Sequence, residues 1–176
     1  MLTSDKTMDF TAVTGFVQTF LVTQEQTGGK YVELEIVLRP GAGGAPLHIH
    51  PHQEERFEVK EGVVDVFHGG VWHKLHSGDV ALVPPGMPDQ FKNTSARPAK
   101  LICRISPVLD FQDMNVTVMK LIHDGKIRSQ KDMKSIIYSS MVLNRFPRSL
   151  RMLNPTYRWT TSFFAFMGKC LGYSID

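Results

Sequence analysis

Hydrophobic and polar residues alternate with a period of two along the first part of the chain. Residues 32–38 are the clearest case, because every second side chain there is a large aliphatic one. Strict alternation predicts a β-strand with one face buried and the other in contact with solvent. Further segments of this kind follow at 55–59 and at VVDVF, VWHKL, VALVP, DQFKN and LICRI. The first 110 residues are therefore expected to form many short strands.

Glycine and proline separate these predicted strands. Turn-forming residues cluster at PGAGGAP, Gly69-Gly70, Ser77-Gly78-Asp79 and Pro84-Pro85-Gly86. Such clusters between alternating segments are typical of tight turns. No helical pattern lies between the strands, so the chain up to residue 110 favours an antiparallel sandwich or barrel over a parallel α/β sheet.

After Asp110 the apolar residues take a helical spacing. A first stripe ends at Asp124-Gly125 and consists of Phe111, Met114, Val118, Leu121 and Ile122. A second consists of Met133, Ile136, Ile137 and Val142, and a third of Trp159, Phe163, Phe166, Met167, Cys170 and Leu171. Apolar stripes at this spacing usually pack against a core. We therefore expect a strand-rich region at 1–110 and a helical extension at 111–176, packed on the strands or on a partner subunit.

Composition places the chain among ordinary globular proteins. It has 176 residues, of which 42% are hydrophobic and 21% charged, which suits one principal domain. Neither a secretory leader pattern nor an apolar run of about 20 residues is present, so a cytoplasmic location is expected. Two cysteines, Cys103 and Cys170, stand in apolar surroundings and are expected to be reduced and buried.

Charge is distributed unevenly. Residues 1–110 carry 10 basic and 13 acidic side chains, whereas residues 111–176 carry 10 and 4. The overall net charge of +3 and the lack of a recognition motif argue against nucleic acid as a partner. The basic stretch 145–158, followed by WTTSFFAFM, is also compatible with an anionic membrane surface or a lid over a lipophilic substrate. Packing of this tail within the protein is the favoured interpretation.

The stretch HIHPHQEERFEVKEG, at residues 48–62, combines residue types that bind metals. If the chain is extended, His48 and His50 point to the same face, because side chains alternate along a strand. In the next strand, Glu55 shares its face with Phe57 and Val59 and therefore points inward. Two histidines and one carboxylate form a facial set that binds a divalent metal, typically iron(II), with zinc, manganese and nickel as alternatives. The competing interpretation is a polar surface loop.

The spacing of these residues resembles the first motif of the cupin superfamily, which is H-x-H, four residues, E, six residues and G. The matching positions are His48, His50, Glu55 and Gly62. The second cupin motif, which is G, five residues, P-x-G, two residues, H, three residues and N, is matched by Gly78, Pro84, Gly86 and Asn93. Asp89 stands where that motif has its histidine. The resemblance covers about residues 31–106 and implies a mainly β fold, the double-stranded β-helix or jelly-roll barrel. The tail looks like that of small single-domain bacterial cupins that carry helices after the barrel.

The resemblance implies a function class without choosing one reaction, because cupins include dioxygenases, isomerases, decarboxylases, cyclases and storage proteins. We expect a small-molecule enzyme that oxygenates, isomerises or cyclises a mainly hydrophobic, oxygen-bearing substrate. The candidate pocket walls are Phe57, Val59, Phe91, Leu101 and Cys103. A non-catalytic cupin that binds a ligand or a metal is the alternative. Barrel cupins often dimerise, so a homodimer is expected.

Asp89 admits two interpretations. It can be a fourth metal ligand, which together with Glu55 would neutralise a divalent ion. It can instead be a general acid or base in a metal-free isomerase or cyclase, with its pKa raised by apolar walls and by Glu55. Glu55 and Asp89 are thus the candidate catalytic residues.

Overall fold

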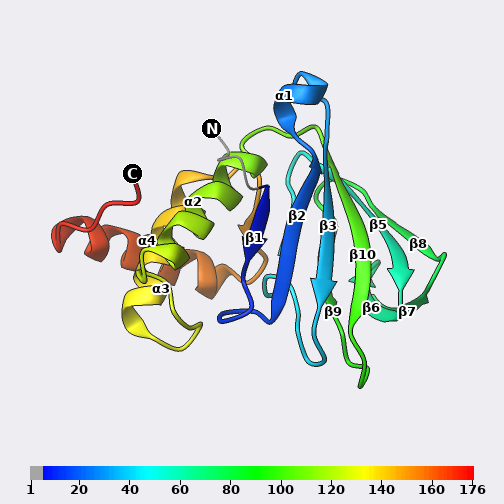
Figure 1. Ribbon diagram of the computed structural model, residues 1–176. Coiled ribbons are helices and arrows are strands. Elements are labelled where there is room, and N and C mark those ends of the chain that lie inside the picture. Colours follow the sequence, from blue (N-terminus) through cyan, green and yellow to red (C-terminus); the bar gives the residue numbers. More distant parts are fainter. Residues whose placement is uncertain (1–5) are drawn as a thin grey trace.

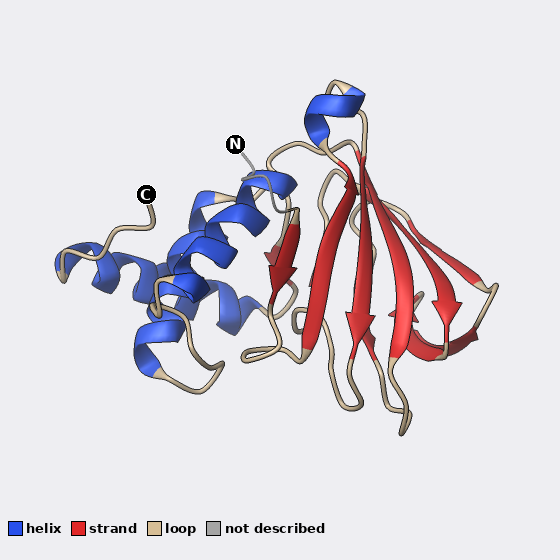
Figure 2. Cartoon of the chain, in the orientation of Figure 1, coloured by secondary structure: helices blue, strands red, loops and turns tan. Residues whose placement is uncertain are grey.

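The computed structural model describes residues 6–176 and shows two antiparallel sheets with three longer helices gathered beside them (Figures 1 and 2). The six-stranded sheet contains, in spatial order, β1 (Thr7–Asp9), β2 (Phe16–Val22), β3 (Val32–Leu38), β10 (Ala99–Ser106), β5 (Glu54–Glu61) and β8 (Val80–Val83). The five-stranded sheet contains β11 (Arg151–Met152), β4 (His48–Ile49), β9 (Pro88–Lys92), β6 (Val63–His68) and β7 (Val71–His76). The helices are α1 (Gln24–Thr27), α2 (Phe111–His123), α3 (Met133–Arg145) and α4 (Pro155–Cys170).

The predicted alternation along the strands is confirmed. In β3 the four aliphatic side chains are buried while the intervening ones are partly exposed. The inner faces of the two sheets pack against each other and supply the core, which is a jelly-roll arrangement. Within residues 6–176 no strand of one sheet pairs with a strand of the other. The mainly β jelly-roll fold is therefore as predicted, with its two sheets facing each other and not closed into a barrel by hydrogen bonds.

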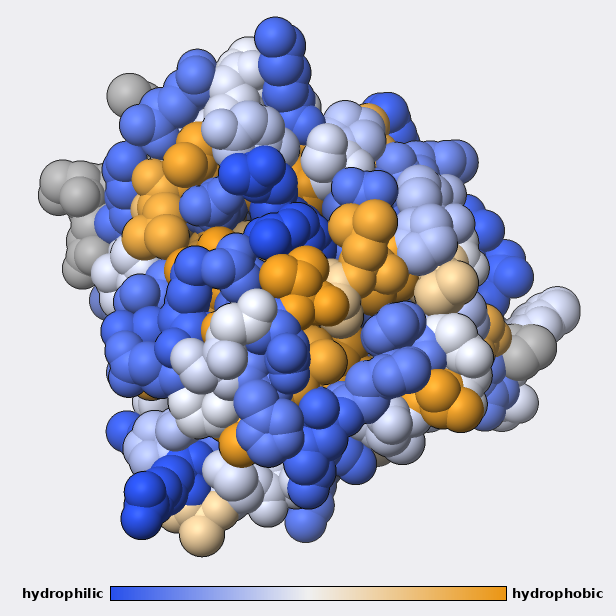
Figure 3. Space-filling view, turned by 90° about the vertical axis from the view of Figure 1, so that its right-hand side faces the viewer, coloured by the Kyte–Doolittle hydropathy of each residue, from blue (hydrophilic) through white to orange (hydrophobic). Residues whose placement is uncertain are grey.

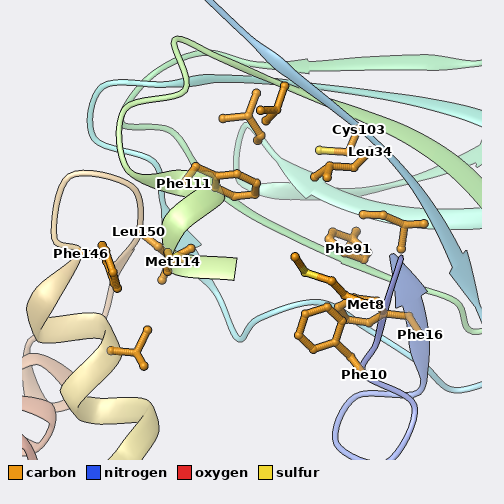
Figure 4. Close-up of a cluster of buried hydrophobic side chains, with 14 of the residues drawn as sticks. Met8, Phe10, Phe16, Leu34, Phe91, Cys103, Phe111, Met114, Phe146 and Leu150 are labelled. Atoms are coloured by element: carbon orange, nitrogen blue, oxygen red, sulfur yellow. The ribbon is translucent and has the colours of Figure 1, made fainter. Parts of the chain in front are cut away.

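The hydrophobic core continues from the sheets into the helices. Figure 4 shows Phe111 and Met114 of α2 between Leu34 and Cys103 on one side and Phe146, after α3, on the other. The predicted end of α2 is also confirmed, because the helix stops at His123 and Gly125 follows with a φ of 65°. The first turn of α2 thus belongs to the same core as the sheets.

Helix α4 packs on α3 through small side chains. Ala165 and Gly168 are buried at this contact. A Cβ atom at Gly168 would lie 2.5 Å from the Sδ atom of Met141 and 2.8 Å from Cγ2 of Ile137. The close approach of the two helices therefore depends on glycine at this position.

The apolar stripe predicted for α4 is present, but it faces solvent. Trp159, Phe163 and Phe166 are all exposed. Cys170 follows on the same face and is exposed too, so the expectation that both cysteines are buried is wrong for this one. The physical reason is that the opposite face of the helix, with its small residues, makes the contact with α3. No helix of the described residues is long and apolar enough to cross a bilayer.

The C-terminal region contributes a strand as well as helices. Strand β11 pairs antiparallel with β4, which places Met152 opposite His48 and Arg151 opposite Ile49. Residues about 100 positions apart in sequence are therefore neighbours at the edge of the five-stranded sheet. The division into 1–110 and 111–176 stays a prediction.

Candidate metal centre

Four of the predicted site residues come together between the two sheets. They are His48, His50, Glu55 and Asp89, and all four are buried. Each offers one ligand atom, and these atoms lie within 4.8 Å of one another. His48 comes from β4 and Asp89 from β9 in one sheet, whereas Glu55 comes from β5 in the other. The cluster is thus formed by both halves of the jelly roll.

Strand register and one turn bring these residues together. His48 lies directly opposite Asp89 in the antiparallel pair of β4 and β9, so their side chains share a face. The carbonyl oxygen of His50 accepts a hydrogen bond of 2.8 Å from the amide of Gly86. Gly86 has a φ of 77°, a conformation that favours glycine. The turn predicted from Pro84-Pro85-Gly86 therefore fixes the backbone beside the second histidine.

The ring of His48 is oriented by a backbone carbonyl. Its Nδ1 atom lies 3.0 Å from the carbonyl oxygen of Pro46. Because a carbonyl can only accept, Nδ1 carries the proton and Nε2 keeps its lone pair. This is the tautomer that binds a metal through Nε2.

The ring of His50 is oriented in the same way by Gln53, which is fully buried. Nδ1 of His50 lies 3.3 Å from Oε1 of Gln53. The side-chain nitrogen of Gln53 donates to the carbonyl oxygens of Pro107 and Val108, at 2.9 and 2.7 Å. These two bonds fix which end of the amide faces the histidine, so Nδ1 of His50 is the donor and its Nε2 atom is the free acceptor.

The two free imidazole nitrogens face each other. Nε2 of His48 and Nε2 of His50 lie 3.1 Å apart. With both Nδ1 atoms protonated, this distance joins two lone pairs and not a donor with an acceptor. Two acceptors at such a distance repel unless a cation or a proton lies between them.

Carboxylate oxygens of Asp89 and Glu55 lie close to the same two imidazole nitrogens. Oδ1 of Asp89 lies 3.6 Å from Nε2 of His48, and Oε2 of Glu55 lies 3.8 Å from Nε2 of His50. Oε2 of Glu55 and both side-chain oxygens of Asp89 are buried and have no hydrogen-bond partner. Buried acceptors without partners are costly, and a bound divalent cation would satisfy all of them at once. The donor set therefore fits a divalent metal ion.

Burial shifts the ionisation of two of the four groups. Burial, and next the charge of Glu55, raise the pKa of Asp89 to about 10. Burial, and next the proximity of His50, lower the pKa of His48 to about 3. At neutral pH and without metal, Asp89 is thus protonated and His48 is neutral. Metal binding would require Asp89 to release its proton, whereas His48 is already in its metal-binding form.

Cys103, predicted as a pocket wall, contacts Glu55, one of the four clustered residues. Its thiol donates to Oε1 of Glu55 over 3.1 Å. Burial raises the pKa of this thiol, so it remains a donor at neutral pH. The contact occupies one oxygen of Glu55 and leaves the other, Oε2, directed towards His50.

The remaining predicted wall residues fill the interior. Phe57, Val59, Phe91 and Leu101 are all buried in the common core, and the rings of Phe57 and Phe91 have centroids 5.5 Å apart. A cavity of about 320 Å³ lies elsewhere, between α3, α4 and the C-terminal segment, and none of these residues lines it. A substrate pocket at the metal ligands stays a prediction.

Two residues that contact the site escaped the sequence analysis. Gln53 orients His50, and its only signal is its position within the polar run that contains the ligands. Phe111 has its ring centroid 6.0 Å from that of His50. In the sequence it is indistinguishable from any other core position of α2.

Two further motif residues have structural roles. Gly62 has a φ of 77°, and a Cβ atom there would lie 2.8 Å from the carbonyl oxygen of Pro98. The side chain of Asn93 donates to the carbonyl oxygens of Leu38 and Arg97. Both residues hold strand ends in place and do not reach the cluster.

Comparison with known protein families agrees with this architecture. Residues 34–105 match the family described as Cupin domain. This segment includes both predicted motifs and all four clustered side chains. No curated protein matches the chain.

Several solved structures are similar. A sugar phosphate isomerase of the cupin superfamily from Silicibacter pomeroyi is 26% identical over 55% of this chain, with a TM-score of 0.48. The match covers 62% of that protein, which is less than two thirds of its length. A predicted oxalate decarboxylase from Thermotoga maritima is 20% identical over 52% of this chain and 80% of its own, with a TM-score of 0.50. KdgF from a Halomonas species is 19% identical over 56% of this chain and 84% of its own, with a TM-score of 0.49. The Thermotoga structure supports the fold and nothing more specific.

Proposed function

We propose that the protein is a divalent-metal-dependent enzyme acting on a small molecule, because residues 34–105 match the cupin domain family and four potential metal ligands come together within this segment. The ligands in this proposal are the four clustered side chains: His48, His50, Glu55 and Asp89. Cupins catalyse many reactions, so the proposal depends on the site and not on the fold.

One observation carries the proposal. The two imidazoles direct their Nε2 atoms at each other over 3.1 Å, with the buried carboxyl groups of Glu55 and Asp89 beside them. Pro46 and Gln53 hold the two rings in this orientation. A set of acceptors fixed around one point is the arrangement that a cation stabilises.

We propose iron(II) as the ion, with manganese, zinc and nickel as alternatives. Imidazole and carboxylate ligands together suit the divalent first-row metals. With both Glu55 and Asp89 ionised, the two negative charges neutralise the divalent ion in a buried site. A soft monovalent ion such as copper(I) gains less from oxygen ligands.

The proposed reactions are oxygenation and isomerisation or cyclisation of a mainly hydrophobic, oxygen-bearing substrate. A bound ion would supply Lewis acidity towards a carbonyl or hydroxyl oxygen, or would activate dioxygen if it is iron. The chain itself provides apolar surroundings that exclude water, from Phe57, Phe91 and Phe111. Glu55, oriented by the Cys103 thiol, and Asp89 are the groups that can hold or move a proton at a carboxylate oxygen.

Metal content is the first test. The untagged protein should contain near-stoichiometric iron, manganese, zinc or nickel by inductively coupled plasma mass spectrometry, and the His48→Ala/His50→Ala double variant should not. His52→Ala is the matched control, because His52 lies in the same stretch but is exposed. Absence of metal from the wild-type protein, even after anaerobic reconstitution with iron(II), would refute the metal site.

Turnover distinguishes an enzyme from a structural metal site. With iron(II)-loaded protein, oxygen uptake is measured in the presence of small hydrophobic alcohols and ketones. In the enzyme, Glu55→Ala should abolish turnover with little change in the fold. If the site is only structural, the same substitution should mainly lower the melting temperature.

A metal-free acid or base centred on Asp89 is the second candidate. It is favoured by the complete burial of Asp89 next to Glu55, since burial and then the charge of Glu55 raise the pKa of Asp89 to about 10. Asp89→His should abolish activity in this case, because histidine in that place supplies a metal ligand but no buried carboxylic acid. An active Asp89→His protein that holds metal would exclude this candidate.

A further inference from the structure

Helix α4 exposes an aromatic stripe to solvent. Trp159 is 81% exposed, Phe163 58% and Phe166 65%. The spacing of four and then three residues places these rings on one face, opposite the face with Ala165 and Gly168 that packs on α3. We call these three residues the outer stripe. Large aromatic side chains gathered on an exposed helix face mark an interaction surface.

The segment that contains the outer stripe is rich in basic side chains, and the carboxylate that follows it, Asp176, is paired with Arg145. From residue 133 to residue 175 the chain contains no acidic side chain. Six basic ones occur in this segment: Lys134, Arg145, Arg148, Arg151, Arg158 and Lys169. Arg158 and Lys169 belong to α4 itself, are exposed, and have no carboxylate partner among residues 6–176. An aromatic face flanked by unpaired cations is complementary to an anionic apolar boundary.

We propose that the outer stripe docks on a membrane surface that contains anionic lipids, with α4 lying in the plane of the interface. The aromatic rings would enter the boundary between headgroups and acyl chains. Arg158 and Lys169, on long flexible stems, would remain at the level of the lipid phosphates. The helix is not a membrane span, which agrees with the lack of any sufficiently long apolar helix in the described structure.

Charge argues against a second copy of the chain as the occupant. A two-fold contact through the outer stripe would place each basic surface against the same basic surface of the other copy. Residues 133–175 hold no carboxylate, and the one that follows, Asp176, is already paired with Arg145, so the two basic surfaces would repel each other. An anionic lipid surface has the opposite sign and removes this penalty.

Another exposed apolar patch provides a matched control. Figure 3 shows hydrophobic side chains gathered on the side of the molecule where β7 and β8 lie in Figure 1. Val71, Val80 and Leu82 of these strands are 47–55% exposed. Asp79 precedes β8, and Glu58 lies on the neighbouring strand β5, so this patch lacks the one-sided charge of the outer stripe. Substitutions in this patch therefore test whether exposed apolar surface by itself is enough for membrane binding.

Vesicle flotation of the 176-residue protein tests the proposal. Vesicles of phosphatidylcholine with 30% phosphatidylglycerol (about one anionic lipid in three) are compared with pure phosphatidylcholine. We expect binding to the anionic vesicles only, and a loss of at least about tenfold in affinity in 0.5 M salt, where surface charge is screened. The triple variant Trp159→Ser/Phe163→Ser/Phe166→Ser should also lose at least about tenfold. The control variant Val80→Ser/Leu82→Ser should bind like the wild-type protein.

Two results would overturn the proposal. One is that the protein floats equally well with anionic and with neutral vesicles, or that it floats with neither. The other is self-association in sedimentation velocity that the triple variant abolishes, which would identify a second copy of the chain as the occupant. Circular dichroism of each variant verifies that the fold is retained. Metal content is independent of this test, so its outcome leaves the proposed function unaffected.

Discussion

The cluster of four ionisable side chains and the outer stripe of α4 are exceptions of opposite kinds to the usual burial of apolar and exposure of charged residues. At the cluster, four ionisable side chains are withdrawn from water between two sheets. At the outer stripe, three large aromatic side chains are left in water on a helix. Buried polar groups and exposed apolar patches are the informative exceptions in a folded protein.

The two regions also differ in how their side chains are held. His48 and His50 are each fixed by a hydrogen bond that Nδ1, on the far side of the ring, donates to an oxygen of Pro46 or Gln53. The aromatic residues of the outer stripe are exposed, and Phe163 has a ring contact only with its chain neighbour Phe164 among the described residues. A preorganised set of acceptors suits one small ion, whereas an exposed aromatic face suits a surface without defined geometry. The comparison therefore indicates a specific ligand at one site and a non-specific one at the other.

Metal addition should give the largest effect. At a metal concentration about 1,000 times the dissociation constant, binding to the native state alone raises the free energy of unfolding by about 4 kcal/mol. Chemical denaturation with and without iron(II), under anaerobic conditions, measures this difference. The His48→Ala/His50→Ala variant should gain nothing. If it gains as much as the wild type, the ion binds elsewhere.

Asp89 should make the stability of the metal-free protein depend on pH. In the unfolded chain its carboxyl ionises near 3.8, whereas in the folded protein it keeps its proton up to about 10. Between these values the native state binds one proton more, so stability falls as pH rises, by up to about 1.4 kcal/mol per pH unit. His48 has the opposite slope, but only between about 3 and 6.5.

The window from pH 7 to pH 8 therefore reports mainly on Asp89, because the buried Cys103 thiol, whose pKa is raised, adds a loss of the same sign only at higher pH. Across it, denaturation of the metal-free wild-type protein should show a loss of up to about 1.4 kcal/mol. Asp89→Asn should remove most of this slope, because the amide does not titrate. An unchanged slope in the variant would assign the titration to another group.

Gln53 should matter for metal affinity although it is not one of the four proposed ligands. Gln53→Leu removes the acceptor that orients His50, and loss of such a contact typically weakens metal binding by about 10–100-fold. Competition with a chelator of known affinity measures the change. Gln112→Leu is the matched control, because Gln112 is also buried and hydrogen-bonded, but to Gln24 and Glu25. It should lower stability and leave metal affinity unchanged.

The two faces of α4 should respond differently to substitution, with the smallest effect on the outer one. Gly168→Ala inserts a methyl group against Met141 and Ile137 and should destabilise the fold by about 1–3 kcal/mol. Trp159→Ser on the exposed face should change stability by no more than about 0.5 kcal/mol. Thermal denaturation of both variants measures the contrast. A large loss in Trp159→Ser would show that the ring has a partner within the protein.

The cluster was predictable because its ligands follow the parity of strands. His48, His50 and Glu55 lie within eight residues of one another, and Asp89 lies at a fixed place in the second motif. Alternation alone gives the face of the strand on which each of these residues lies, and the second motif adds Asp89 as the fourth member. The pairing of β4 with β9, which places His48 opposite Asp89, comes from the structure. The contacts of Gln53 could not be predicted, because its partners at 107 and 108 are more than 50 residues away.

The first strands were missed for a different reason. In β2 the inward face consists of Phe16, Gln18 and Phe20, and the buried glutamine interrupts the apolar alternation. Gln18 is tolerated there because it donates to Asn115 of α2, a contact that no local pattern reveals. For α4 the spacing of the stripe is as predicted, but spacing cannot tell which of two apolar faces packs inward.

The pairing of β4 with β11 also has a consequence for folding during synthesis. On the ribosome, His48 emerges about 100 residues before its strand partner Met152. During that interval one edge of the five-stranded sheet has unpaired backbone groups, which can pair with another nascent chain. Chains that stop before residue 151 would keep this edge permanently open. The short strand β11 thus covers the edge of a sheet whose neighbouring strand β4 emerges about 100 residues earlier.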